Sequence, residues 1–370
     1  MSHLGNTYFF TGFPGFISIN LIKSLLKQFD NIEKIYLLSL PSTMKKAEQI
    51  VQQLLNEIDY KEKEDLFELI EGDITKENLN VDEAVNKKLK EEVTHVFHLA
   101  AIYDLAVAKD LAVDVNVNGT YYVNDWVKKL NHLERYIYFS TAYVAGTREG
   151  KILETELEMH QGFKNHYEKT KYDAEVLVKK LMAYVPTTII RPGVVMGHSE
   201  TGETIKFDGP YFILNFFDRL KFMPIIPYLG KGEGKGNFVP IDYIINASLY
   251  LSHSPKGVGK TYHLADPNPY KMKDIYRIVS EEYLGRKPVG TIPLSLAKAM
   301  LSIPFMRKWL KVEKEALDYF IFKAEHDCSQ AEQDLAGSGI TCPDFKDAIK
   351  PVIAFYKEHK NDASKHIKIV

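Results

Sequence analysis

The sequence is short of cysteine, of long apolar runs and of excess charge of either sign. Its two cysteines, Cys328 and Cys342, are too few for a disulfide scaffold and lack the partners that a zinc site would need. No apolar run reaches the roughly 18 residues of a membrane-spanning helix, and the N-terminal residues do not resemble a signal peptide. The net charge of −2 gives no basis for binding nucleic acid. We therefore expect a soluble, cytoplasmic protein without a metal site.

The chain does have enough apolar residues, 45% of 370, to bury a large core. Its first half alternates strand-like and helix-like segments, which predicts a parallel sheet covered by helices. Strands are predicted at 7–10, 35–38, 67–70, 93–99, 136–139 and 187–190, and helices at 19–29, 45–58, 115–130 and 167–181. After 191–193 the pattern loosens, although 237–251 predicts a strand and helix and 260–264 another strand.

A glycine-rich turn follows the first predicted strand, at residues 11–18 (TGFPGFIS). One glycine directly after a strand allows a tight turn, and a second lets the backbone approach a pyrophosphate at the next helix N-terminus. The small Ser18 at the third position permits close packing of helix and strand. An ordinary Gly/Pro turn is the alternative. The candidate cofactor-binding residues here are Gly12, Phe13, Gly15, Phe16 and Ile17.

The end of the second predicted strand bears on the choice of cofactor. An acidic residue there would bind the ribose of NAD, whereas a basic one suits the 2′-phosphate of NADP. Ser39 is followed by Leu-Pro without an acid, and Lys45 and Lys46 come soon after. Ser39 and Lys45 thus become candidates, and NADP(H) is favoured over NAD(H). The alternative is that both lysines are the solvated start of a helix.

Two later strand ends add further candidates for the same cofactor. Asp73 and Ile74 follow the third strand, where a carboxylate or backbone group can meet an adenine amine; a turn-capping Asp is equally compatible. Small residues after the fourth strand leave room for cofactor at the carboxyl edge of the sheet. These are Leu99, Ala100 and Ala101, whereas His98 is interpreted as a packed histidine.

Tyr167 and Lys171 lie four residues apart on a predicted helix and so share a face. A nearby ammonium can lower the pKa of a phenol, so that the pair exchanges a proton with an alcohol or carbonyl. Thr141 ends the fifth strand and is our choice for a second hydroxyl at the substrate oxygen, with Ser140 as the other candidate. Asn116 opens the preceding helix and could hold it through backbone contacts. The alternatives are surface or capping roles for each residue.

These motifs together resemble the extended short-chain dehydrogenase/reductase family. The likeness runs from about residue 8 to 266, and its motifs occur in the family's order: 11–15, 73–74, 99–101, 116–120, 140–141, 167–171 and 191–193. It implies a Rossmann-type doubly wound parallel sheet with a smaller, mostly helical C-terminal substrate lobe. It implies Tyr167 as acid/base, Thr141 as substrate-orienting and Lys171 also as a ribose ligand. By the same likeness, Pro192, Gly193, Val194 and Val195 contact the cofactor. The departure is Ser18, where many members have Gly.

The amino-acid sequences of residues 11–16 and 140–144 resemble those of the thioester reductase and fatty acyl reductase ("male sterility") branch. Residues 210–227 are rich in Phe, Ile and Leu, which favours an apolar, carrier- or CoA-linked acyl chain as the small-molecule substrate; the lobe's own core is the alternative. A ketone/alcohol dehydrogenase, a sugar-nucleotide epimerase or dehydratase, and a non-catalytic NADP(H) sensor remain open. The pattern does not predict an oligomeric state.

The expected domain division has three parts. Residues 1–192 plus about 237–266 form the NADP-binding domain, 193–236 plus 267–360 form the substrate lobe, and 361–370 form a polar tail. Residues 293–310 predict an amphipathic, basic-ended helix, which we interpret as facing the core, with a membrane surface or a pocket cover as alternatives.

Overall fold

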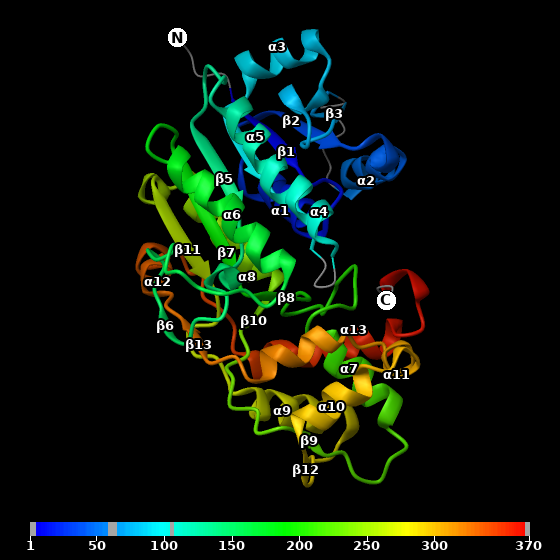
Figure 1. Cartoon of the computed structure of the whole chain (residues 1–370). Helices are drawn as coiled ribbons and strands as arrows, with labels where there is room; N and C mark the ends of the chain where they lie inside the picture. Colours follow the sequence, from blue (N-terminus) through cyan, green and yellow to red (C-terminus); the bar gives the residue numbers. More distant parts are fainter. Residues whose placement is uncertain (1–4, 58–64, 104–106, 367–370) are drawn as a thin grey trace.

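The computed structural model describes residues 5–57, 65–103 and 107–366. It has two parts, a helix-covered sheet and a smaller helical lobe beneath it in Figure 1. The predicted fold class is confirmed, because the sheet is wholly parallel and has seven strands in the order β11-β7-β5-β4-β1-β2-β3. The strands are β1 (Asn6–Thr11), β2 (Ile32–Ser39), β3 (Phe67–Glu71), β4 (His95–His98), β5 (Arg135–Phe139), β7 (Thr187–Pro192) and β11 (Lys260–Leu264).

The order of the strands makes the sheet doubly wound. The chain begins at β1, builds outward through β2 and β3, returns to the other side of β1 as β4, and continues outward to β11. The direction of winding therefore changes between β1 and β4. Ligands of open parallel sheets bind at the carboxyl ends of the strands beside such a change.

Alternate residues of the central strands enter two separate cores, one on each face of the sheet. Tyr8 and Phe10 pack with α1 and α8, whereas Phe9 between them packs with Trp126 of α5. One face carries α1 (Phe16–Gln28), α2 (Met44–Glu57), α8 (Ile241–His253) and α12 (Ser329–Leu335). The other carries α3 (Glu83–Glu92), α5 (Gly119–Val127) and α6 (His166–Leu181). A short α4 (Lys109–Ala112) and one π-helical turn (Val113–Asn118) lead into α5.

The lobe has a third core of its own, built around aromatic rings such as Phe217 and Tyr276, whose centroids are 4.7 Å apart. Its helices are α7 (Tyr211–Leu220), α9 (Met272–Leu284), α10 (Leu294–Leu301), α11 (Pro304–Leu310) and α13 (Phe345–His359), with a short strand pair, β9 (Tyr228–Leu229) and β12 (Thr291–Ile292). Two more pairs join lobe and sheet: β8 (Val194–Met196) with β10 (Phe238–Pro240), and β6 (Gly150–Ile152) with β13 (Ala324–His326).

Two features bear on the expected lobe. The helix α12, from the segment assigned to the lobe, packs against β11 and α8 on the sheet. The amphipathic segment 293–310 forms two short helices, in which Ala297, Leu301 and Leu310 are buried in the lobe core. Within the described ranges, no helix is both long and apolar enough to span a membrane.

Candidate active site

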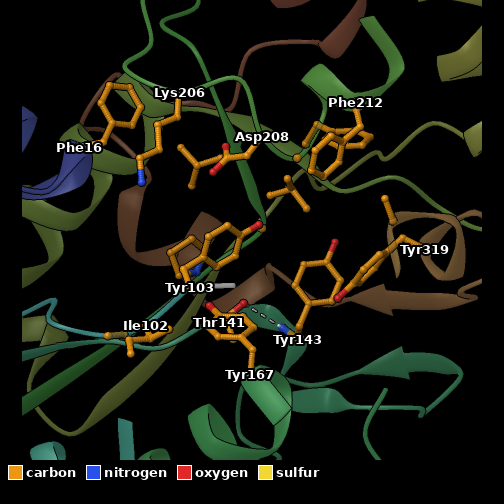
Figure 2. A pocket seen from close by; sticks show the side chains of 18 of the residues that line it. Phe16, Ile102, Tyr103, Thr141, Tyr143, Tyr167, Lys206, Asp208, Phe212 and Tyr319 are labelled. Atoms are coloured by element: carbon orange, nitrogen blue, oxygen red, sulfur yellow. Dashed lines mark hydrogen bonds between the residues drawn. The ribbon is translucent and has the colours of Figure 1, made fainter. Parts of the chain in front are cut away.

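A cleft of about 1110 Å³ begins at the carboxyl edge of the sheet and continues between the helices of the lobe. Its sheet end is lined by the glycine-rich turn after β1 and by the loops after β2, β3 and β4. Its lobe end is lined by apolar side chains of α7, α10 and α11. Figure 2 shows the region where the two ends meet, with Thr141 and Tyr167 on the sheet side and Asp208 and Phe212 across the cleft.

The turn after β1 approaches the neighbouring backbone too closely for side chains. Gly12 has φ +80°, and a Cβ there would lie 2.7 Å from the backbone nitrogen of Ala100. A Cβ on Gly15 would lie 2.6 Å from the Gly12 carbonyl oxygen. The Ser18 hydroxyl donates to the carbonyls of Gly12 (3.1 Å) and Gly15 (2.9 Å), which fixes the turn at the start of α1. This shape suits a pyrophosphate at a helix N-terminus.

Most of the predicted cofactor residues lie along the sheet end of the cleft. Those that line it are Gly12, Phe13, Gly15, Phe16, Ile17, Asp73, Ile74, Leu99, Ala100, Ala101, Lys171, Pro192, Gly193, Val194 and Val195. Ser39 and Lys45 are not among the lining residues. The Ser39 hydroxyl is buried and donates to the Phe13 carbonyl (3.1 Å), so it supports the turn from behind. Lys46, one residue further along α2, lines the cleft where Lys45 does not.

His98 is packed, as interpreted from the sequence. Its ring nitrogens lie 2.7 Å from the Thr11 hydroxyl and 3.2 Å from the Thr120 hydroxyl. Burial lowers the pKa of His98 to about 3, so the ring is neutral and joins β1 to α5.

Tyr167 stands in the first turn of α6, a helix capped by the Asn165 side chain, which accepts from the amide of Glu168 (2.9 Å). Its hydroxyl is near enough to the Thr141 side chain for that side chain to lower its pKa, and its ring packs edge-to-face with that of Tyr103 at a centroid distance of 5.1 Å. Burial raises the pKa of Tyr167 above its usual value. The phenol is therefore protonated at neutral pH and suited to giving a proton.

Lys171 lies one turn further along α6 but is directed at the sheet. Its Nζ donates to the Phe139 carbonyl (2.7 Å) and to the Tyr138 hydroxyl (3.1 Å). Burial lowers the pKa of Lys171 to about 7, against the opposing effect of Glu175. Burial dominates the pKa of Tyr167 in this structure, and the Lys171 ammonium is engaged elsewhere. The lowering expected from Lys171 together with an oxidised nicotinamide stays a prediction for the cofactor-bound protein.

The two candidate hydroxyls after β5 have different surroundings. Ser140 donates to Glu175 (2.5 Å), which is paired with Arg191 (2.6 Å) in a buried ion pair. The Ser140 proton is therefore engaged away from the cleft. The Thr141 hydroxyl acts on the phenol of Tyr167 to lower its pKa, and it accepts from the amide of Tyr143 at 3.3 Å. Between the two candidates, this arrangement favours Thr141.

Asn116 is buried in the π-helical turn and does not line the cleft. Its Oδ1 accepts from the amide of Ile102 (2.9 Å), and its Nδ2 donates to the Thr170 hydroxyl (3.0 Å). It therefore ties the loop after β4 to α6 and acts through position, because nothing places it at the reacting atoms.

Several cleft residues were missed from the sequence. Tyr103, Tyr143 and Tyr319 surround the Tyr167 hydroxyl region from three separate segments, and Asp208 faces them from the lobe (Figure 2). Of these residues, only Tyr143 could have been proposed from the sequence, since it closely follows Ser140-Thr141 in the motif. Tyr319 had no such signal, because its approach depends on how the lobe folds back on α6.

Residues 210–227 were expected either to line an apolar substrate pocket or to form the core of the lobe. Phe212 and Ile213 are both buried in the lobe core and line the cleft. The same holds for Leu301 and Leu310 of the basic-ended segment. One set of side chains thus serves both purposes.

Comparison with known proteins agrees with this geometry. Residues 10–248 match the male sterility protein family of NAD-binding domains. An alcohol-forming fatty acyl-CoA reductase of Simmondsia chinensis is 23% identical over 80% of this chain and 74% of its own length. The fatty acyl-CoA reductase wat of Drosophila melanogaster is 25% identical over 65% of this chain. The chain spans about half the length of the two matched Drosophila reductases, 54% and 53%.

Solved structures share the whole fold. The terminal R domain of the myxalamid PKS-NRPS pathway superposes with a TM-score of 0.81 at 22% identity, over 98% of this chain and 93% of that one. A UDP-glucuronic acid 4-epimerase from Bacillus cereus reaches 0.65 at 20% identity, over 95% of this chain and 99% of that one. Reductase and epimerase frameworks therefore both fit, and the lining of the cleft has to distinguish them.

Proposed function

Because the chain belongs to the male sterility protein family of NAD-binding domains, we propose that it is an NADP(H)-dependent reductase of acyl thioesters. The observation that carries the proposal is the course of the cleft. It leads from a phosphate-binding turn, past Tyr167 and Thr141, into a pocket of apolar side chains. A nicotinamide and an apolar acyl chain can thus meet at the two hydroxyls.

The residues present fit a dinucleotide. Gly12 and Gly15 leave the backbone free to approach a pyrophosphate, and Asp73 and Ile74 line the sheet end of the cleft, where the proposal puts the adenine. The choice of NADP(H) is supported by Lys46 at the cleft and by the lack of an acid in the Ser39–Pro41 stretch. When bound, the reduced nicotinamide supplies a hydride.

The protein's own contribution is proton transfer and polarisation. Tyr167 and Thr141 place two hydroxyl groups at this point of the cleft, and one of them can donate its proton to a substrate oxygen. That donor stabilises negative charge on the thioester oxygen, as in an oxyanion hole. Overall the thioester takes up a hydride and a proton, its C–S bond breaks, and aldehyde and free thiol leave. No nucleophilic side chain is needed.

The composition of the cleft favours this substrate over a sugar nucleotide. Its charged lining residues beyond the sheet end are Lys206, Asp208 and Lys235, and the remainder is dominated by Phe, Leu, Ile, Met and Trp. A uridine diphosphate would need several cationic partners there. A long acyl chain needs none, and an apolar pocket stabilises it by removing its surface from water. The lining of the cleft does not distinguish an acyl group carried by CoA from one carried by a carrier protein.

The test follows the absorbance of NADPH on mixing the protein with long-chain acyl-CoA thioesters, aldehydes and ketones. Oxidation with thioesters and release of one thiol per NADPH would support the proposal. Oxidation with ketones or aldehydes alone would move the function to carbonyl reduction. NADPH binding without any turnover would favour the sensor.

A further inference from the structure

A buried carboxylate directly follows Tyr167. The Glu168 side chain is fully buried, and three groups hold it. Its Oε2 accepts from the backbone amide of Lys164 at 3.0 Å. Its Oε1 accepts from the Lys164 ammonium at 3.3 Å and from the Tyr319 hydroxyl at 3.0 Å. These contacts join two parts of the chain about 150 residues apart.

The partners of Glu168 come from both sides of the cleft. Lys164 precedes α6, and its ammonium also donates to the Gly146 carbonyl (2.9 Å) and lies 3.6 Å from the centroid of Phe322. Tyr319 belongs to the 3-10 helix Lys314–Phe320, lines the cleft, and meets the ring of Tyr143 edge-on at 5.0 Å. Figure 2 shows these two tyrosines side by side, next to Tyr167.

The charges in this cluster depend on one another. Burial raises the pKa of Glu168 and lowers that of Lys164, and each partner opposes that shift in the other, so removing either one would move the other further toward its neutral form. The groups that interact with Glu168 include Tyr143, Tyr167 and Tyr319, and those that interact with Lys164 include Asp318 and His326. Burying an ion pair costs free energy unless its remaining hydrogen bonds are made. Here the Tyr319 hydroxyl supplies one of those bonds from the lobe.

We propose that Glu168 is a positioning residue which, with Lys164 and Tyr319, ties the lobe to the first turn of α6 and so fixes the Tyr167 hydroxyl in the cleft. The inference rests on the proposed role of Tyr167 as proton donor. Tyr167 and Glu168 are neighbours in one helical turn, so a shift of the Glu168 contacts moves the phenol too. Misplacement of a reacting group by about 1 Å can lower a rate about 100-fold.

The test is Tyr319→Phe, which removes one hydroxyl and keeps the ring against Tyr143. A matched control is Tyr283→Phe, because the Tyr283 hydroxyl also donates to a carboxylate held by a lysine. That carboxylate is Asp218 (2.6 Å), and neither residue lines the cleft. We expect Tyr319→Phe to lower kcat about tenfold or more. NADPH affinity and KM should stay within about twofold, and the control should leave all three unchanged.

A second measurement does not depend on turnover. Hydrogen exchange should become about fivefold faster, or more, at the backbone amides of 165–170 in Tyr319→Phe, since the bond that the hydroxyl donates to Glu168 and the longer one that it accepts from Asn165 (3.5 Å) are both lost there. It should not change there in Tyr283→Phe. A Tyr319→Phe, Glu168→Ala double variant should lose no more activity than Glu168→Ala alone, because both changes break one network.

The proposal is overturned if Tyr319→Phe keeps kcat within twofold of the wild type, or if exchange at 165–170 is unchanged. It is also overturned if both tyrosine variants lose activity equally, which would indicate a general loss of stability. If the wild type reduces no thioester, the proposed function fails by itself. The exchange comparison still decides whether the lobe is tied to α6 through Glu168.

Discussion

Replacing Tyr167 by Phe separates chemistry from folding and cofactor binding. The change removes only the hydroxyl and keeps the ring contact with Tyr103. A positioned general acid typically contributes about 10²–10⁴ in rate, and kcat for thioester reduction should fall by that factor. The lost contact with Thr141 should lower the free energy of unfolding by about 1 kcal/mol or less. NADPH affinity should stay within about twofold, since the phosphate turn is untouched.

The assay is NADPH oxidation at saturating thioester, with binding followed by nicotinamide fluorescence and stability by denaturant unfolding. Tyr136→Phe is the matched control. Its buried hydroxyl donates to Asn124 (3.0 Å), and it does not line the cleft. It should cost stability to a similar degree and leave kcat unchanged. Unchanged turnover in Tyr167→Phe would refute the mechanism, as would an equal loss of turnover in the control.

Three further outcomes are expected. Gly12→Ala should weaken NADPH binding and destabilise the protein by about 2 kcal/mol or more, because its Cβ would lie 2.7 Å from a backbone nitrogen at φ +80°. Gly259→Ala, at φ +71° with nothing within 4 Å, measures the backbone part alone, and an equal effect there would contradict the steric argument. Lys46→Ala should reduce affinity for NADPH about tenfold without changing that for NADH, whereas Lys45→Ala should change neither. Equal NADPH affinities of the two variants in binding titrations would count against the 2′-phosphate site. The free energy of unfolding should decrease by about 1.4 kcal/mol for each buried neutral histidine when the pH is lowered from 7.5 to 5.5. The sign follows because folded pKa values far below the unfolded ones make the unfolded state bind more protons below about pH 6.5. The buried Glu154, with its pKa raised to about 7, works in the opposite direction and offsets part of that fall. The histidines concerned are His95, His98 and His326, with pKa values lowered to about 3, His253, with its pKa lowered to about 4, and His263, with its pKa lowered well below its usual value. Urea unfolding across that pH range that showed constant or rising stability would contradict this accounting.

The local elements of the sheet half were within reach of the sequence. Strand 260–264 was predicted at its observed limits, and α6 began within one residue of its expected start. These segments carry their own hydrophobic period and are preceded by Gly259 and by the N-cap Asn165, so their starts are set locally. The helix α3 was not predicted, because most of its residues are polar or charged and only Asn86 and Leu89 are buried, which is too short an apolar stripe to show a helical period.

The lobe was predicted only as a helical region. Its helices α10 and α11 were expected as one helix over 293–310, but Pro304 opens a second one. The helix α12 could not be assigned to the sheet from its own residues, since its partners lie on α8 and β11, far away in the chain. Contacts of this kind have no local signature.

The sequence alone determined the chemistry that this protein has available: a glycine turn after the first strand, a Tyr and Lys one helical turn apart, and a hydroxyl at a strand end. Such motifs are read from spacing because their geometry is fixed by one strand or one helix. Only the tertiary structure decided which groups are engaged: Ser140 with Glu175, Lys171 with the sheet, and Tyr319 with Glu168. Burial and long-range pairing set those partners and the direction of each pKa, and both arise when distant segments pack together.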